Sequence, residues 1–373
     1  MKKQKLQAIS LFSGAGGMDI GVRNAGFNIL AEIEFDQHCC ATLEANAEAQ
    51  GYGSKVIHAD IRNVDPKQLM TDLSIKEDEL DLLFGGPPCQ SFSLAGKQRG
   101  LDDERGLLLF EIIRFAKDMR PKVIFLEQVK GLLSSKGKSN RRGEVFEKLL
   151  KELENIGYTP KWQVIMAADY GVPQLRERLF VIATRGHNGF HFPERTHAPI
   201  EESNWLFSYK PYVGIGEVLN GLSEPDPKIQ GRTFYDRADS HVDVTPPRDR
   251  ERIAQVPEGS YLAAQTHLGE ELRCGLSPKD TTKYLRLHRK RPSNTLRCGE
   301  IFYHPTENRY LTPREYMRIH GYPDSYILKG PIRSRTGSVP NLDQHRQVAN
   351  SVPPPLAEAI ALQIKGFLDE QNI

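Results

Sequence analysis

The first half of the chain alternates short β-rich runs with amphipathic segments, and this alternation restricts the fold more than any other feature. The expected helices include Asp36–Ala47, Gly106–Asp118 and Val145–Ile156. Such alternation is typical of a mostly parallel sheet with helices on both faces, whose ligands bind at the carboxyl ends of the strands. The pattern therefore predicts an α/β domain. Its expected strands are Gln7–Phe12, Ile29–Ile33, Lys55–His58, Asp81–Phe84, Lys122–Leu126, Gln163–Ala167 and Leu179–Thr184.

The alternation stops after Thr184. The stretch from Arg185 to Arg289 is rich in Pro, Gly, Asp and Arg and has few periodic segments, so we expect a second, smaller domain of irregular or β structure. The stretch Pro355–Phe367 returns to a helical pattern.

Composition excludes several classes of protein. No apolar run is long enough to cross a bilayer. The 373 residues include five cysteines, an odd number without CxxC spacing, so neither a disulfide framework nor a metal site is expected, and a cytoplasmic location fits. The net charge is only +2, but the segment Arg273–Arg297 holds eight Lys or Arg against one acid, Asp280. On charge alone, this basic stripe is interpreted as a solvated face.

A glycine-rich turn, Phe12–Gly17, follows the first expected strand and leads into a helical segment. Glycines let the backbone turn tightly and approach a ligand, and a helix start offers free N–H groups. Glu34 ends the second strand, where an acid can accept hydrogen bonds from ribose hydroxyls, and Asp60 ends the third. The combination indicates an adenosine-containing cofactor but does not separate NAD from S-adenosylmethionine.

The segment Gly85–Ser93 (GGPPCQSFS) follows the fourth strand. Its two prolines stiffen the backbone that leads to Cys89, which therefore lies at a strand end beside the cofactor region. A cysteine is an effective nucleophile as its thiolate. A single cysteine is more often a buried structural thiol, but this context favours a nucleophile.

These motifs resemble those of the DNA (cytosine-5)-methyltransferase family, and the resemblance covers most of the chain. Two departures stand out: Gln128 replaces the usual Asn that holds the local backbone, and Ala349 replaces a common Gly. The resemblance rests on Phe12–Gly17, Pro87-Pro88-Cys89-Gln90, Phe125-Leu126-Glu127-Gln128-Val129, Gln174-Leu175-Arg176-Glu177-Arg178, Arg291–Leu296, Leu311–Glu315 with Gly321–Asp324, and Ala349–Pro354.

The resemblance implies a Rossmann-like, S-adenosylmethionine-dependent fold and a set of catalytic residues. Cys89 would attack carbon 6 of cytosine, protonated Glu127 would bond the N3 and N4 edge, and Arg176 and Arg178 would orient the base and the Glu. The implied contacts to S-adenosylmethionine are Phe12, Gly14, Gly16, Glu34, Phe35, Asp60, Pro88, Leu108, Asn350 and Val352. Phe35 would pack against adenine, although a core aromatic is an equal reading of the residue.

The resemblance also implies double-stranded DNA as the partner. The target carbon is buried in the duplex, so the cytosine must rotate out of the stack. The polar segment Ser91–Arg105 is expected to form a loop in which Ser93, Lys97 and Arg105 contact phosphates. The expected domains are residues 1–190 (catalytic and cofactor-binding), 191–343 (target recognition, with the basic stripe on phosphates) and 344–373 (a return to the catalytic domain).

Four functions are compared. The preferred one is a monomeric DNA enzyme that is paired with a restriction endonuclease. An RNA (tRNA) cytosine-5 methyltransferase is the main alternative, and the long irregular region before Arg291 argues for DNA. A nicotinamide-dependent oxidoreductase explains the glycine-rich turn and Glu34 but not Cys89 together with Glu127. A non-catalytic DNA-binding module is disfavoured because all four catalytic positions are filled.

Overall fold

The computed structural model describes residues 5–88, 108–137, 139–202, 209–227, 240–277, 279–281, 283–333 and 341–371. The chain divides into two compact units. Unit 1 comprises residues 1–166, 177–194 and 354–373, and unit 2 comprises residues 167–176 and 195–353.

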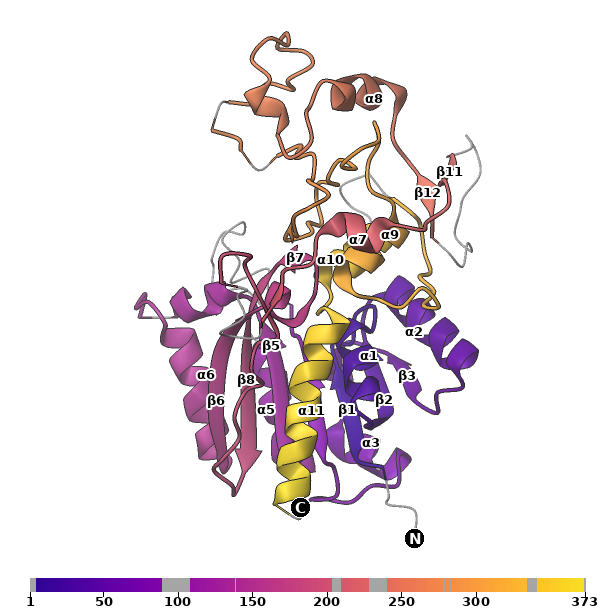
Figure 1. Ribbon diagram of the computed structural model, residues 1–373. Coiled ribbons are helices and arrows are strands. Elements are labelled where there is room, and N and C mark those ends of the chain that lie inside the picture. Colours follow the sequence, from indigo (N-terminus) through magenta and orange to yellow (C-terminus); the bar gives the residue numbers. More distant parts are fainter. Residues whose placement is uncertain are drawn as a thin grey trace. The chain divides into compact units, whose positions relative to one another are not determined.

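Unit 1 is built on a seven-stranded sheet in the order β3-β2-β1-β4-β5-β8-β6 (Figure 1). Strand β8 runs antiparallel to both of its neighbours, whereas the pairs from β3 to β5 are parallel. Only ten residues join β6 to β8, which is too short for a parallel crossover and forces the reversal. This sheet confirms the predicted Rossmann-like α/β fold. The strands are β1 (Gln7–Leu11), β2 (Asn28–Glu34), β3 (Lys55–His58), β4 (Leu82–Gly85), β5 (Val123–Gln128), β6 (Tyr158–Met166) and β8 (Glu177–Arg185).

Helices cover the sheet of unit 1. One apolar core cluster joins alternate strand residues, such as Leu11, Leu83 and Leu126, to helices α3 (Pro66–Asp72), α5 (Glu111–Met119) and α6 (Glu144–Asn155). Alternate residues of a strand point to one face, so these three helices share a face.

Two further helices of unit 1 pack against each other, α1 (Gly17–Asn24) and the last helix α11 (Pro354–Glu370) (Figure 1). A Cβ atom on Gly21 would lie 2.5 Å from the backbone nitrogen of Glu358, so only glycine permits this close approach. Helix α11 confirms the helical pattern read from Pro355–Phe367.

Capping residues mark where the helices after β2 and β3 begin. The Asp36 side chain accepts hydrogen bonds from the backbone nitrogens of His38 and Cys39 and caps α2 (Gln37–Gln50), which ends at left-handed Gly51. Asp65 caps α3 in the same way, with Pro66 at its first position. Helix α3 was not predicted, because seven residues are too few for a clear periodic pattern.

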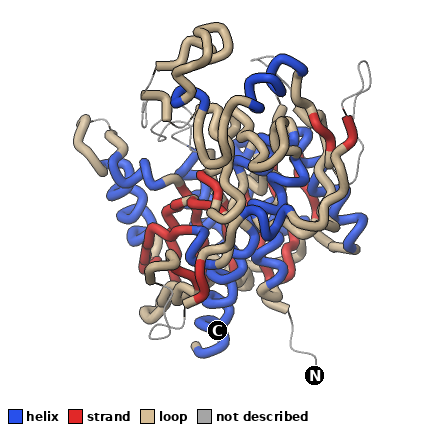
Figure 2. The backbone as a smooth tube through the Cα atoms, turned by 45° about the horizontal axis from the view of Figure 1, so that its top comes forward, coloured by secondary structure: helices blue, strands red, loops and turns tan. Residues whose placement is uncertain are grey.

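Unit 2 consists mostly of loops, drawn in tan in Figure 2, and each strand among its described residues has only two residues. It also contains helices. The prediction of an irregular or β domain missed α7 (Ile215–Leu219), α8 (Pro247–Ala254), η6 (Leu262–Ala264) and α9 (Pro313–His320), and the other helices of unit 2 are η5 (Ala167–Tyr170) and α10 (Gln344–Asn350). Its strands are β7 (Gln174–Leu175), β9 (His197–Ala198), β10 (Lys210–Pro211), β11 (Asp226–Pro227), β12 (Val242–Asp243) and β13 (Ser293–Asn294).

No helix in the described part of the chain is long and apolar enough to cross a membrane. Within the same residues, no group of three or more His, Cys, Asp or Glu side chains is placed to hold a metal ion.

Candidate active site

The predicted site residues of unit 1 gather at one edge of its sheet. Strands β1 to β5 are parallel neighbours, so the residues that follow them lie at a common carboxyl edge. Strand β8 runs the opposite way, so its first residues lie at the same edge. This topology brings together the glycine-rich turn, Glu34, Asp60, Glu127 and Arg178.

The turn after β1 has a left-handed backbone at Phe12, Gly14 and Gly16, with φ angles of 56°, 55° and 73°. A bulky residue rarely adopts this conformation, so Phe12 marks a constrained turn. A Cβ atom built on Gly14 would meet no atom of the described structure within 4 Å. The turn therefore presents open backbone at the carboxyl edge.

The Glu34 side chain accepts hydrogen bonds from the backbone of two segments, the glycine-rich turn and the residues that follow β2. Its Oε2 atom accepts a hydrogen bond from the Gly14 nitrogen at 2.7 Å. Its Oε1 atom accepts from the nitrogens of Phe35 and Asp36 at 2.9 and 2.8 Å. Burial raises the pKa of Glu34 above its ordinary value, although these three bonds oppose the shift. The carboxyl group thus joins the end of β2 to the glycine-rich turn.

Two further predicted cofactor contacts, Phe35 and Asp60, lie at the ends of β2 and β3. Phe35 is 67% exposed, which rules out the reading of a core aromatic. Asp60 pairs with Arg62 at 2.6 Å, and hydrogen bonds from that guanidinium lower the pKa of Asp60. The end of β2 therefore offers an aromatic face, and the end of β3 a carboxylate.

Glu127 and Arg178 form an ion pair across two strands. In the register of β5 and β8, Glu127 lies opposite Phe180 and Gln128 opposite Leu179, so Arg178 falls just beyond the end of β5. The Nε atom of Arg178 is 3.0 Å from Oε1 of Glu127, with the two side chains 14% and 13% exposed. The structure therefore brings together two of the four predicted catalytic residues.

The backbone before Cys89 passes close to this pair. A Cβ atom on Gly85 would lie 2.2 Å from the carbonyl oxygen of Leu11, and one on Gly86 would lie 3.0 Å from Oε2 of Glu127. Buried Gln128 donates from Nε2 to the carbonyl oxygen of Pro87 at 2.8 Å and accepts from the Val129 nitrogen at 2.9 Å. Gln128 therefore ties the proline loop to the end of β5, a role that the sequence marked only as a departure.

Several predicted residues lie outside the described part of the chain. They are Cys89, Ser93, Lys97 and Arg105, all within residues 89–107. The adjoining described residues, Pro88 and Leu108, are partly buried.

The remaining predicted residues lie in unit 2. Arg176 is almost fully buried, and its Nη2 atom donates to the carbonyl oxygens of Ala349 and Ser351 at 3.0 and 2.9 Å. The Asn350 side chain between them is exposed and accepts a hydrogen bond from the Cys298 thiol. Val352 is buried. Within unit 2, Arg176 therefore holds the turn that carries Asn350.

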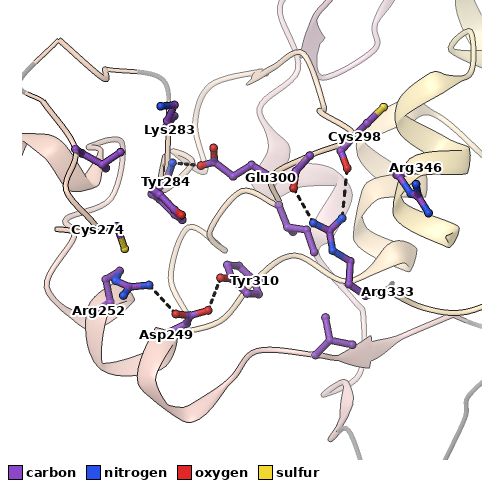
Figure 3. Close-up of a pocket in the computed structure, with 14 residues that line it drawn as sticks. Asp249, Arg252, Cys274, Lys283, Tyr284, Cys298, Glu300, Tyr310, Arg333 and Arg346 are labelled. Carbon is purple, nitrogen blue, oxygen red and sulfur yellow. Dashed lines mark hydrogen bonds and ion pairs between the residues drawn. The ribbon is translucent and has the colours of Figure 1, made fainter. Parts of the chain in front are cut away.

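Unit 2 also contains a cavity of about 890 Å³ that no sequence pattern predicted (Figure 3). Asp249 on its wall pairs with Arg252 at 2.6 Å and accepts from the hydroxyl of Tyr310 at 2.6 Å. Burial raises the pKa of Glu300 to about 7, and its carboxyl group accepts from the Tyr284 nitrogen. The cavity is thus polar and aromatic, and these two carboxyl groups have partners within its wall.

The predicted phosphate-binding role of the basic stripe is partly wrong. Arg286 is buried, and its guanidinium donates to several backbone carbonyls, including those of Pro305 and Val256 at 3.0 Å. Arg289 pairs with Glu258 at 2.9 Å. Sequence counts charges without their partners, and the partners of Arg286 are carbonyl oxygens within unit 2.

Comparison with known proteins agrees with this arrangement. The family model of the C-5 cytosine-specific DNA methylases matches residues 6–366. The type II methyltransferase M.FnuDI of Fusobacterium nucleatum is 32% identical over 98% of this chain and 96% of its own length. M.Eco47II of Escherichia coli, another type II methyltransferase, is 31% identical over 98% of this chain and 80% of its own length.

A solved structure shares the fold. It is described as a DNA modification methyltransferase encoded within a prophage in E. coli, and it matches with a TM-score of 0.72 at 23% identity, covering 98% of this chain and 99% of the other. The family match spans nearly the whole sequence, and the sheet of unit 1 carries the glycine-rich turn, Glu34, Glu127 and Arg178 at one edge. The chain therefore belongs to the C-5 cytosine-specific DNA methylase family and is a DNA (cytosine-5)-methyltransferase.

Proposed function

We propose that the protein methylates carbon 5 of a cytosine that has been flipped out of a specific double-stranded DNA sequence. In this proposal Cys89 forms a covalent bond to carbon 6, and S-adenosylmethionine is the methyl donor. The observation that carries it is the Glu127–Arg178 ion pair beside the proline loop that leads to Cys89. Methyl transfer by wild-type protein and by Cys89→Ser tests the reaction and the nucleophile together.

The residues at the carboxyl edge suit an adenosine-containing group. Gly14 has open space above its backbone, Phe35 presents an exposed ring, and Glu34 is fixed beside both. Phe12, Gly14, Gly16, Glu34, Phe35, Asp60, Pro88 and Leu108 of unit 1, with Asn350 and Val352 of unit 2, are proposed to hold S-adenosylmethionine. When bound, this group supplies an electrophilic methyl on a sulfonium sulfur.

Cys89 acts first in the proposed reaction. Its thiolate bonds to carbon 6, the ring loses its aromaticity, and the displaced electron pair makes carbon 5 nucleophilic. Once carbon 5 carries the methyl group, a base takes its proton, and the electron pair of that C–H bond forms the double bond to carbon 6 as the bond from carbon 6 to sulfur breaks. Cys89 leaves as the thiolate, and the double bond between carbons 5 and 6 returns.

Glu127 and Arg178 stabilise the base during this attack. Glu127, in its protonated form, donates to N3, where negative charge develops, and accepts from the N4 amino group. The Arg178 guanidinium fixes the orientation of the Glu127 carboxyl group. Arg176 supports the reaction from unit 2, where it holds the turn around Asn350.

The functional division of the chain remains a proposal as well. Residues 1–190 would form the catalytic region, residues 191–343 would read the DNA sequence, and residues 344–373 would complete the catalytic region. Ser93, Lys97 and Arg105 would contact phosphates. Because several relatives are named type II methyltransferases, we propose that the protein protects DNA from a partner endonuclease. We also propose that it acts as a monomer in the cytoplasm.

The test is tritium transfer from labelled S-adenosylmethionine to unmethylated genomic DNA, with transfer RNA assayed in parallel. We expect label in DNA only, and bisulfite sequencing would then map the modified cytosines. Label in transfer RNA alone would contradict the proposal and favour an RNA enzyme.

The matched variant is Cys89→Ser, which changes one atom of the nucleophile. It should lose transfer and still bind S-adenosylhomocysteine in calorimetry. Wild-type transfer that survives in Cys89→Ser would exclude the covalent mechanism.

A further inference from the structure

A buried hydrogen-bond chain in unit 2 connects the turn that carries Arg176 with the turn that carries Asn350. Its central member is His320, the last residue of α9, which is fully buried. Gln174 lies on one side of the imidazole ring and the carbonyl oxygen of Ser351 on the other. Neither His320 nor its two bonds belongs to the catalytic set described above.

The direction of each bond follows from its partners. The Leu296 nitrogen lies 3.1 Å from Oε1 of Gln174, and a backbone N–H can only donate. The amide nitrogen of Gln174, Nε2, can only donate hydrogen bonds, and it lies 2.9 Å from Nδ1 of His320. Nδ1 must therefore accept, which fixes the imidazole in its neutral form with the proton on Nε2.

The proton on Nε2 then points to a backbone carbonyl. Nε2 of His320 lies 3.0 Å from the carbonyl oxygen of Ser351 and donates to it. The same oxygen accepts from Nη2 of Arg176 at 2.9 Å. A carbonyl oxygen has two lone pairs, so the two bonds fill its accepting capacity and fix the peptide that follows Asn350.

The hydrogen bonds clamp the backbone on both sides of Asn350 and leave its side chain exposed. Arg176 also binds the carbonyl oxygen of Ala349 at 3.0 Å. Strand β13 pairs with β7, and this pairing holds the segment of Leu296 next to that of Gln174. The position of the Asn350 turn thus depends on a neutral His320 as well as on Arg176.

We propose that His320 is a positioning residue for cofactor binding, which holds the turn of Asn350 and Val352 by donating from Nε2 to Ser351. The inference rests on the proposed role of that turn in binding S-adenosylmethionine. It predicts that the donor on the Nε2 side matters for cofactor affinity, whereas the acceptor on the Nδ1 side serves only to fix the ring.

Two substitutions separate the sides of the ring. In His320→Gln the amide nitrogen reaches the place of Nε2 and can still donate to Ser351. In His320→Asn the shorter amide reaches only the place of Nδ1, so it can accept from Gln174 but cannot reach Ser351. His241→Asn is the matched control, because His241 is a buried imidazole whose Nε2 lies 2.7 Å from the carbonyl oxygen of Ser223, a contact that the shorter amide likewise cannot reach.

The measurement is the Kd of S-adenosylhomocysteine by calorimetry, with thermal unfolding of each variant to verify folding. We expect His320→Asn to bind about tenfold more weakly, the loss of one buried hydrogen bond, and His320→Gln to stay within about threefold of wild type. In DNA methylation, His320→Asn should raise the KM for S-adenosylmethionine more than it lowers kcat. His241→Asn should lower the unfolding temperature and leave the Kd unchanged.

Equal Kd values for folded His320→Asn and His320→Gln would overturn the inference. Weaker binding of S-adenosylhomocysteine by His241→Asn would overturn it as well, since the loss of any buried imidazole contact in unit 2 would then weaken binding. Failure of the proposed function looks different. In that case wild-type protein would itself not bind S-adenosylhomocysteine, whatever residue 320 is.

Discussion

The Nε atom of Arg178 lies 3.0 Å from Oε1 of Glu127, and the pair is about six-sevenths buried. The contact exists because β8 is reversed in an otherwise parallel neighbourhood, so that its beginning meets the end of β5. A partly buried guanidinium orients a carboxyl group more firmly than an exposed ion pair does. The pair is therefore suited to fix the carboxyl group that meets the base.

Replacing Arg178 by Lys should slow catalysis while cofactor binding persists. A lysine keeps the charge but loses the planar geometry that orients Glu127. We expect kcat to fall about 100-fold, within the range for a positioned acid–base group, and the Kd of S-adenosylhomocysteine to change less than about threefold. Glu177→Gln is the control, because it breaks the exposed Lys130–Glu177 pair and should leave kcat within about twofold. Wild-type kcat in Arg178→Lys would contradict the orienting role.

Truncating Gln128 should disturb the proline loop. Gln128→Ala removes the bond to the Pro87 carbonyl and the bond from the Val129 nitrogen. We expect unfolding to become easier by about 1–3 kcal/mol, the cost of unsatisfied buried groups, and kcat to fall at least tenfold. Gln128→Asn restores the residue usual in the family, but this side chain is one methylene shorter. It should lower stability and kcat less than Gln128→Ala does. Urea unfolding and kcat together check this prediction, which fails if Gln128→Asn matches or exceeds wild-type kcat.

The sheet was predictable because its strands have strong local patterns. Residues Lys55–His58 were predicted with the bounds observed for β3. Strand β6 begins five residues earlier than predicted, since Pro160 argues against a strand by itself. Its place at the sheet edge allows that proline. Helix α9 was missed although Thr312 and Glu315 form a capping box at its start.

The candidate site was predictable in part for a similar reason. The alternation of strands and helices implies a common carboxyl edge, which places Glu34 near the glycine-rich turn. The bonds from Arg176 to Ala349 and Ser351 join residues more than 170 positions apart. No local sequence pattern encodes such a contact. The backbone carbonyls that accept hydrogen bonds from Arg286 in the basic stripe are equally absent from any local pattern.

Replacing Glu34 by Gln should weaken cofactor binding and the turn together. Both carboxyl oxygens of Glu34 accept from backbone N–H groups, and an amide would turn a donor toward one of them. We expect S-adenosylhomocysteine to bind at least tenfold more weakly, and stability to fall by about 1–3 kcal/mol. Exposed Glu44 on α2 is the control, and Glu44→Gln should change neither quantity. Calorimetry and urea unfolding decide, and unchanged affinity in Glu34→Gln would remove this residue from the proposed cofactor site.

Asp19 gives unit 1 a stability that depends on pH. It is buried in α1, and desolvation, with a smaller contribution from the charge of Glu32, raises the pKa of Asp19 from 3.8 to about 8. Between those two pH values the folded protein holds a proton on Asp19 that the unfolded chain has released. The difference in bound protons, unfolded minus folded, is therefore negative, and the contribution of Asp19 to stability falls as pH rises from about 4 to about 8.

The variant Asp19→Asn removes this titration and keeps the shape of the side chain. In urea unfolding at pH 5, 6, 7 and 8, the free energy of unfolding of wild type relative to Asp19→Asn should decline with pH, by at most about 1.4 kcal/mol per pH unit for a single proton. Above pH 8 the difference should become constant, because Asp19 is then charged in both states. Asp72→Asn, at an exposed position of α3, is the control for the substitution itself. A constant difference for Asp19→Asn from pH 5 to 8 would mean that Asp19 is already ionised in the folded protein at pH 5, with Arg23, which pairs with Glu32 at 3.0 Å, stabilising the charges of both carboxylates.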